Sequence, residues 1–164
     1  MVNINIVADK AKLIIFFIFF ALIPYSCENE KNDVIPDVYV DFTMDLNDIE
    51  FVNLSSVFGS VYVNANTNNW GQKASGYDGN GIIVFAGPAG EYYSYDRTCP
   101  HDYYTNNLSV KVSVVDIIYA ECPRCKSRYA LTNGGTPLSD AISKYPLKNY
   151  RTTYLGNYLR VWNY

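Results

Sequence analysis

Two short stretches of this sequence hold residues that could bind a metal. The first, TCPHDYY, contains Cys99 and the single histidine of the chain, His101. The second, ECPRCKSRY, contains Cys122 and Cys125. Thiolates and imidazole suit soft or borderline metals, and four such ligands complete a tetrahedral zinc site or a [2Fe–2S] cluster. The pattern Cys-x-His followed by Cys-x-x-Cys therefore predicts one shared metal centre.

The same residues allow two other interpretations. The cysteines could be buried packing residues, with His101 exposed in a loop. Cys122 and Cys125 could form a redox disulfide of the thioredoxin type, although that motif opens a helix and the following KSRYAL is typical of a strand. No nucleophile–base pair, paired acid or nucleotide-binding loop is visible elsewhere in the sequence. We therefore do not expect catalysis by this chain alone.

The elements that position these residues are predicted to be strands. Alternation of apolar and polar residues indicates half-buried strands, and Gly- or Asn-containing turns separate them. These features occur in segments 38–46, 56–65, 81–100, 110–123, 127–138 and 149–164. Residues 66–81 are predicted to be a polar loop, and no helical stripe of ten or more residues appears beyond the N-terminus. The fold class is therefore all-β, with antiparallel strands and the two Cys-Pro loops at strand ends.

The N-terminus is set apart from this fold. Lys10 and Lys12 precede an apolar run from Leu13 to Ser26. A membrane-spanning helix needs about 20 apolar residues, and this run is shorter, as is typical of a signal peptide. The alternative is a short transmembrane anchor. Cys27 follows directly, as in the lipobox of bacterial lipoproteins, which this stretch resembles.

These features predict a signal peptide at 1–26, a lipidated Cys27 with a polar tether at 27–37, and a domain at 38–164. The protein would then be a lipoprotein of the cell envelope, held to a membrane in the periplasm or at the outer-membrane surface. With Cys27 acylated, three cysteines remain, and an odd number cannot all pair in disulfides within one chain. The net charge is −3, without a basic block, so nucleic acid is not an expected partner.

The sequence from Val38 to Tyr164 resembles the Rieske-type [2Fe–2S] proteins. In that family a hairpin ends in Cys-x-His, and a second loop carries Cys-x-x-His, often followed by Gly-Ser-x-Phe or Tyr. GIIVFAGPAGEYYSYDRTCPHD is similar to the first half, and AECPRCKSRYALTNGGTPLSDA is similar to the second. YPLKNYRTTYLGNYLRVWNY resembles the closing strands. The resemblance implies a Rieske-like antiparallel β-sandwich with a small metal-binding subdomain formed by the two loops.

The resemblance also implies a role for each ligand. Cys99 and Cys122 match the ligands of the buried iron, and His101 matches the first imidazole on the outer iron. Cys125 stands in place of the second histidine, which is a departure from the family pattern. Two imidazoles keep a Rieske centre at roughly −150 to +300 mV, against about −400 mV for all-cysteine plant-type clusters. One added thiolate should therefore place the potential below typical Rieske values.

The function implied is one-electron transfer by a membrane-tethered protein, with a redox partner that the sequence does not identify. The alternative is a zinc-stapled or metal-free binding lipoprotein that uses tyrosine-rich loops for a partner. The N-terminal segment has no arginine pair and resembles an ordinary secretory signal, which passes unfolded chains. A Cys₃His site filled after export could take zinc as a closed structural site.

Overall fold

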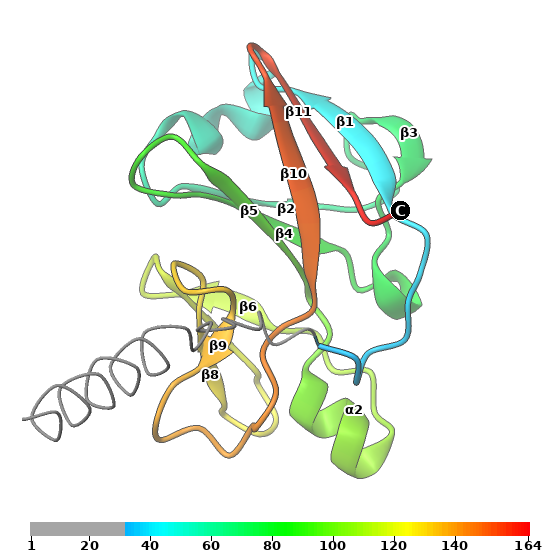
Figure 1. The fold of residues 1–164 in the computed structure, drawn as a ribbon, viewed down its shortest axis with the longest axis vertical. Coiled ribbons are helices and arrows are strands. Elements are labelled where there is room, and N and C mark those ends of the chain that lie inside the picture. The colour runs from blue at the N-terminus through cyan, green and yellow to red at the C-terminus, as the bar shows by residue number, and fades with distance from the viewer. Residues whose placement is uncertain (1–31) are drawn as a thin grey trace, which may run out of the picture.

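A computed structural model describes residues 32–164, so the predicted signal peptide and Cys27 lie outside the described residues. The described chain forms two antiparallel sheets (Figure 1). The larger has the strand order β2-β4-β5-β10-β11-β1-β3, and the smaller has the order β6-β7-β8-β9. This confirms the predicted all-β class. The strands are β1 (Asp41–Asp45), β2 (Ser60–Val63), β3 (Trp70–Lys73), β4 (Ile82–Ala86), β5 (Tyr92–Asp96), β6 (Ser113–Val115), β7 (Tyr119–Glu121), β8 (Arg128–Ala130), β9 (Thr136–Pro137), β10 (Asn149–Leu155) and β11 (Tyr158–Trp162).

The larger sheet folds over an apolar core, with β10, β11 and β1 lying across from β2 and β4 (Figure 1). Phe42 and Met44 of β1, Leu159 of β11 and Val84 of β4 all belong to this core. The predicted alternation in 38–46 is confirmed, because Phe42 and Met44 are buried while Thr43 between them is partly exposed. Apolar residues on one side of each strand thus hold the two halves of the sheet together.

A second core lies between the larger sheet and the smaller one. Strand β4 is buried along its whole length, since Ile82 and Val84 face the first core while Ile83 and Phe85 face the second. A continuous apolar run is what a strand covered on both faces requires. The second core also contains Cys99 and Cys122. Strand β4 therefore connects the packing of the fold to the predicted metal site.

The structure differs from the predicted strands in two places. Within 66–81, predicted to be a loop, β3 pairs with the edge of β1 through Asp41↔Lys73 and Thr43↔Trp70. Segment 110–123 is a hairpin of β6 and β7 rather than one strand, and Asp116 and Ile117 have positive φ angles in its turn. The causes differ: the glycine-rich composition of 66–81 concealed the short strand β3, whereas the β6–β7 turn uses Asp116 and Ile117 without a Gly or Pro signal.

Short helices complete the described chain. They are the 3₁₀ helices η1 (Ile49–Ser55) and η2 (Tyr77–Gly79), and the α-helix α2 (Pro100–Asn106). Gly59 follows η1, and a Cβ at this position would lie 1.7 Å from the Asn53 carbonyl oxygen, so the close approach requires glycine. None of the helices in residues 32–164 is long and apolar enough to cross a membrane.

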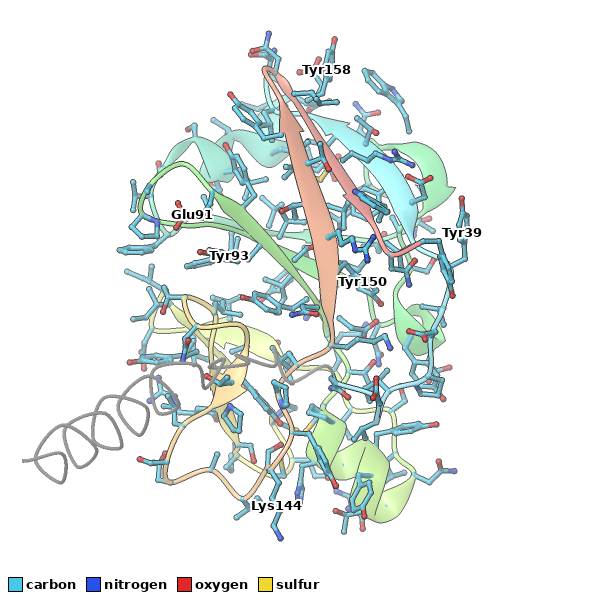
Figure 2. The ribbon with its side chains drawn as sticks, viewed as in Figure 1. Tyr39, Glu91, Tyr93, Lys144, Tyr150 and Tyr158 are labelled. Carbon is cyan, nitrogen blue, oxygen red and sulfur yellow. The ribbon has the colours of Figure 1, made fainter. Side chains whose placement is uncertain are left out.

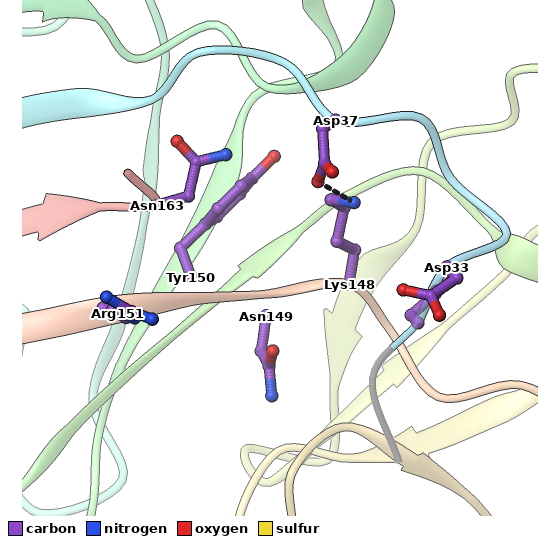
Figure 3. A pocket seen from close by; sticks show the side chains of 8 residues that line it. Asp33, Asp37, Lys148, Asn149, Tyr150, Arg151 and Asn163 are labelled. Atoms are coloured by element: carbon purple, nitrogen blue, oxygen red, sulfur yellow. Dashed lines mark ion pairs between the residues drawn. The ribbon is translucent and has the colours of Figure 1, made fainter. Parts of the chain in front are cut away.

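The end of the predicted tether packs against the domain. Asn32 is buried, and its side-chain amide donates a hydrogen bond to the Pro146 carbonyl oxygen. Lys148 donates to the Ile35 carbonyl oxygen at 2.8 Å and pairs with the Asp37 carboxylate at 2.6 Å (Figure 3). These groups border a pocket of about 400 Å³ whose lining carries charges of both signs. The polar segment 32–37 is therefore anchored to the start of β10.

Candidate metal centre

The first Cys-Pro stretch begins a helix rather than forming an open loop. Cys99 is the N-cap of α2, Pro100 is in the first helical turn, and the left-handed Asn107 ends the helix. Proline favours the first turn of a helix because its φ is preset and its missing N–H has no partner there. The helix has seven residues, too few to show a periodic apolar stripe. The sequence pattern therefore did not predict this helix and indicated a loop at the end of a strand instead.

This helix decides which side chains of the stretch converge. Cys99 and Asp102 are three residues apart, so they lie on the same side of one helical turn. Asp102 is 1% exposed, whereas His101 is partly exposed. Neighbouring helical residues point about 100° apart. The helix therefore directs Asp102 inward and His101 in a different direction.

The second Cys-Pro stretch is the turn between β7 and β8. The Cys122 N–H donates to the Ser127 carbonyl oxygen at 3.0 Å, and the Lys126 N–H donates to the Cys122 carbonyl oxygen at 3.0 Å. Lys126 takes a positive φ of 60°, which closes the turn. Cys122 is buried and Cys125 is partly exposed. The turn therefore presents two sulfurs, one deeper than the other.

The two stretches bring four ligand atoms together. The sulfurs of Cys99 and Cys125 are 3.6 Å apart, and the Cys122 thiol donates to Asp102 Oδ2 at 3.0 Å. The ligand atoms of Cys99, Asp102, Cys122 and Cys125 all lie within 4.8 Å of one another. Among the described residues, His101 contributes no atom to this group. Three of the four sequence-predicted ligands thus converge, together with a carboxylate that sequence reasoning missed.

The surroundings of the group hold its members in place. The Tyr129 hydroxyl lies 3.4 Å from the Cys99 sulfur. Arg124 Nε lies 3.3 Å from Asp102 Oδ1, on the side of the carboxylate away from the Cys122 thiol contact. Arg124 is about half-exposed, so it covers the buried carboxylate toward solvent. The group is therefore packed on its inner side, while the half-exposed Arg124 and the partly exposed Cys125 lie on its outer side.

A buried carboxylate, Asp96, anchors the chain that enters the first stretch. Asp96 Oδ1 accepts a hydrogen bond from the Thr98 N–H at 2.8 Å. Its Oδ2 accepts from the Tyr77 N–H and from the Tyr150 hydroxyl, each at 2.6 Å. The Cys99 N–H then donates to the Val110 carbonyl oxygen at 2.8 Å. These bonds fix the backbone immediately before the first sulfur.

The surroundings of the group lower the pKa of Asp102 and raise the pKa of Cys122 and of Cys125. Burial alone would raise the pKa of Asp102, but hydrogen bonds from the thiols of Cys122, Cys125 and Cys99 and the charge of Arg124 outweigh it and lower that pKa. The contact with Cys99, burial and the contact with Asp102 raise the pKa of Cys122. Burial raises the pKa of Cys125. A metal ion would have to displace these thiol protons on binding.

The side chains fit a thiolate-bound metal in type and in position. Three sulfurs and a hard oxygen suit zinc or iron. A tetrahedral zinc ion with Zn–S bonds of about 2.3 Å spaces its sulfurs roughly 3.8 Å apart, near the observed 3.6 Å. A [2Fe–2S] cluster takes the same donor types but divides its ligands between two irons. The three cysteines are free, and 3.6 Å is far beyond the S–S bond length of about 2.05 Å.

The site lies at one end of the molecule. Figure 2 places Lys144 at the end where α2 lies, and Tyr158 at the opposite end, beside the turn between β10 and β11. Tyr104 of α2 is 66% exposed and packs against Tyr145, with ring centroids 5.0 Å apart. Aromatic surface therefore lies on α2, the helix that carries Asp102.

Comparisons with known proteins give distant structural likenesses. No protein-family model matches the sequence, and no curated protein matches it. The fold is similar to the ferredoxin of carbazole 1,9a-dioxygenase from Nocardioides aromaticivorans IC177, at 18% identity over 54% of this chain and 80% of that chain, with a TM-score of 0.38. It is also similar to a putative nitrite reductase NADPH small subunit, at 17% identity over 76% of this chain and 98% of that chain, with a TM-score of 0.40. A third likeness is to a complex of reduced oxygenase and oxidized ferredoxin in carbazole 1,9a-dioxygenase, at 12% identity over 77% of this chain and 94% of that chain, with a TM-score of 0.44. With TM-scores below 0.5, the function has to be inferred from the side chains of the site.

Proposed function

We propose that this chain is a Rieske-like one-electron carrier whose iron–sulfur centre is bound by Cys99, Cys122, Cys125 and a fourth ligand from α2. The observation that carries this proposal is the convergence of three sulfurs from two separate elements within 4.8 Å. A [2Fe–2S] centre bound there would supply one-electron chemistry. We propose a carrier rather than an enzyme because the sequence shows no nucleophile–base pair, paired acid or nucleotide-binding loop.

The protein's part in this function is to bury the centre and leave one side accessible. Cys99 and Cys122 are fully buried in the second core, while Cys125 is partly exposed. Electron exchange with a partner would therefore proceed on the side of Cys125 and α2. The Tyr129 hydroxyl, 3.4 Å from the Cys99 sulfur, supports the reduced state, because a hydrogen bond to a sulfur stabilises added negative charge.

We further propose that the domain is tethered to a membrane of the cell envelope through a lipidated Cys27. Five residue steps separate Cys27 from Asn32, which is buried against the domain. Fully extended, five steps span at most about 18 Å. A lipid anchor at Cys27 would thus hold the domain close to the membrane surface. The redox partner would be a protein that reaches the centre at that surface.

A specific observation also supports a second candidate function. The sulfurs of Cys99 and Cys125 are 3.6 Å apart, which is close to the distance between two sulfurs bound to one zinc ion. A zinc ion would then staple α2 to the β7–β8 turn, and the domain would act as a binding module. Zinc has no redox chemistry, so a zinc protein would be colourless and would accept no electron, unlike an iron–sulfur protein.

The test is to purify the full chain without chelators and to determine its metal content, visible absorption and electron paramagnetic resonance (EPR) spectrum after reduction. The proposal predicts a brown protein with two irons and two inorganic sulfides per chain, and an EPR signal that appears on one-electron reduction. A colourless protein with one zinc per chain would contradict electron transfer and establish the second candidate. A protein without bound metal under these conditions would contradict both.

A further inference from the structure

Two adjacent residues of α2, His101 and Asp102, could supply the fourth ligand of the proposed metal centre. The family resemblance points to His101. The structure places Asp102 with the sulfurs, and His101 is not part of that group in the described chain. The two side chains leave the helix about 100° apart, so they point in different directions from α2.

We propose that the Asp102 carboxylate is the fourth ligand, so that the centre has three thiolates and one carboxylate and leaves His101 free. This inference rests on the proposed metal centre but not on the identity of its metal. Asp102 Oδ2 accepts a hydrogen bond from the Cys122 thiol at 3.0 Å. The same carboxylate lies within 4.8 Å of the other two sulfurs. It therefore stands at the fourth corner of the ligand group.

The second oxygen of Asp102 is held by other side chains. Oδ1 pairs with Arg124 Nε at 3.3 Å and accepts a hydrogen bond from the Asn106 amide at 3.5 Å. Metal-binding carboxylates are commonly oriented in this way, with one oxygen on the metal and the other hydrogen-bonded to the protein. Arg124 and Asn106 thus fix the carboxylate so that Oδ2 faces the sulfurs.

The burial of Asp102 supports the same conclusion. An ionised carboxylate that is 1% exposed needs strong compensation, because removing its charge from water costs several kcal/mol. Its described partners are one half-exposed arginine, one long amide contact and thiols, which are weak donors. A metal cation among the three sulfurs would add a full opposite charge to these partners, which is the interaction that favours a buried carboxylate most strongly. A carboxylate kept only for helix capping would not need to be buried among cysteines.

The charge of the centre follows from this ligand set. A carboxylate carries a negative charge, whereas the imidazole implied by the family resemblance is neutral. The centre would therefore hold one more negative charge than a Cys₃His centre. Added negative charge opposes reduction, so the ligand set favours an oxidised cluster or a divalent ion without redox chemistry.

X-ray absorption spectroscopy tests the ligand set directly. The full chain is loaded in separate samples with zinc and with iron and sulfide, and the metal edge is recorded for each. The inference predicts a zinc shell of three sulfurs and one oxygen, without the outer-shell scattering that an imidazole ring produces. Imidazole scattering at either metal edge would overturn it.

Matched variants of the two neighbours give a second test. Asp102→Asn should weaken zinc affinity more than 100-fold, because even partners of metal ligands contribute about 10- to 100-fold. His101→Ala is the control and should retain wild-type affinity. Asp102→Cys should restore tight binding with a fourth thiolate, seen with Co²⁺ as stronger sulfur-to-cobalt absorption. Loss of binding in His101→Ala with retention in Asp102→Asn would reverse the assignment.

The design separates this inference from the proposed function. If the purified protein carries zinc alone, electron transfer fails, yet the zinc edge still reports whether Asp102 or His101 binds. If Asp102→Asn does not fold, the Co²⁺ spectrum of Asp102→Cys and the zinc edge of the unaltered chain decide the question. If the metal in Asp102→Cys has no more sulfur ligands than the metal in the unaltered chain, the side chain at position 102 is not a ligand.

Discussion

The Tyr129 hydroxyl lies 3.4 Å from the Cys99 sulfur, inside the core that joins the two sheets. Tyr129 comes from β8, which follows the second Cys-Pro stretch, whereas Cys99 belongs to the first. The contact therefore connects the two Cys-Pro stretches through a side chain that lies outside the candidate ligand group. Its strength should depend on the charge of the sulfur.

Replacement of Tyr129 by phenylalanine should lower the reduction potential. In the proposed cluster the hydroxyl would stabilise the more negative reduced state, and a net hydrogen bond of about 0.5–1.5 kcal/mol corresponds to roughly 20–60 mV for one electron. Tyr95→Phe is the matched control, because its hydroxyl donates to the Leu131 carbonyl oxygen in the same core. Voltammetry of both variants should show a downward shift only for Tyr129→Phe. Equal shifts would mean that the effect is one of packing.

Replacement of Cys125 by histidine should raise the potential. The change exchanges an anionic ligand for a neutral one on the exposed side of the centre, so the oxidised state accepts an electron more readily. Rieske centres and all-cysteine plant-type clusters differ widely in reduction potential, so we expect a rise on the order of 100 mV or more. Protein-film voltammetry of the two proteins side by side measures it. A couple that stays at the wild-type value would show that Cys125 is not a ligand.

Loss of the Arg124 side chain should weaken metal binding without removing a ligand. Arg124→Ala leaves Asp102 Oδ1 with only the 3.5 Å contact from the Asn106 amide, so the carboxylate is held less firmly and zinc affinity should fall by about 10- to 100-fold. Lys126→Ala is the control, since this neighbouring cation pairs with Glu121 at 3.7 Å and not with Asp102. Competition with a chromophoric chelator gives both affinities. A loss of the same size in Lys126→Ala would indicate a general effect of positive charge.

The buried pair of Tyr150 and Asp96 should make the domain sensitive to alkali. Burial, and then the negative charge of Asp96, raise the pKa of Tyr150 above its ordinary value near 10. A raised pKa contributes stability that is fully present below pH 10 and is lost as the pH rises above it, at up to about 1.4 kcal/mol per pH unit. Denaturant unfolding between pH 8 and pH 11 should show this decline.

Tyr150→Phe tests the origin of that decline. The variant loses the 2.6 Å hydrogen bond to Asp96, which should cost about 1.5–3 kcal/mol at pH 8 because the acceptor is charged. Its free energy of unfolding should fall less steeply above pH 10 than that of the wild type. Parallel curves for the two proteins would place the alkaline sensitivity elsewhere.

Processing at the N-terminus is predicted from the sequence. Mass spectrometry of the membrane fraction should detect no peptide from residues 1–26 and should find Cys27 carrying a lipid. Cys27→Ser should move the protein out of the membrane fraction, because the acyl chains supply the membrane affinity. An intact Met1 in the mature protein would disprove this prediction.

The sequence by itself determined most of the strands and the three sulfurs. Period-two alternation in 38–46 and the apolar run of β4 predict buried strands, because side chains alternate across a sheet and cores select apolar residues. The scarcity and pairing of Cys99, Cys122 and Cys125 predict a shared site. These features are local, or depend on composition, and so they can be read without knowing which segments meet.

Only the tertiary structure decided which fourth side chain faces those sulfurs. The stretch CPHD reads as a loop carrying Cys-x-His, and the signals for a helix were Pro100 and the acidic residue two positions later. Seven residues are too few to form a stable helix alone, so α2 depends on Cys99 and Asp102 packing against the β7–β8 turn. That packing sets the rotation of the helix, and the rotation places Asp102 among the sulfurs and leaves His101 outside the group.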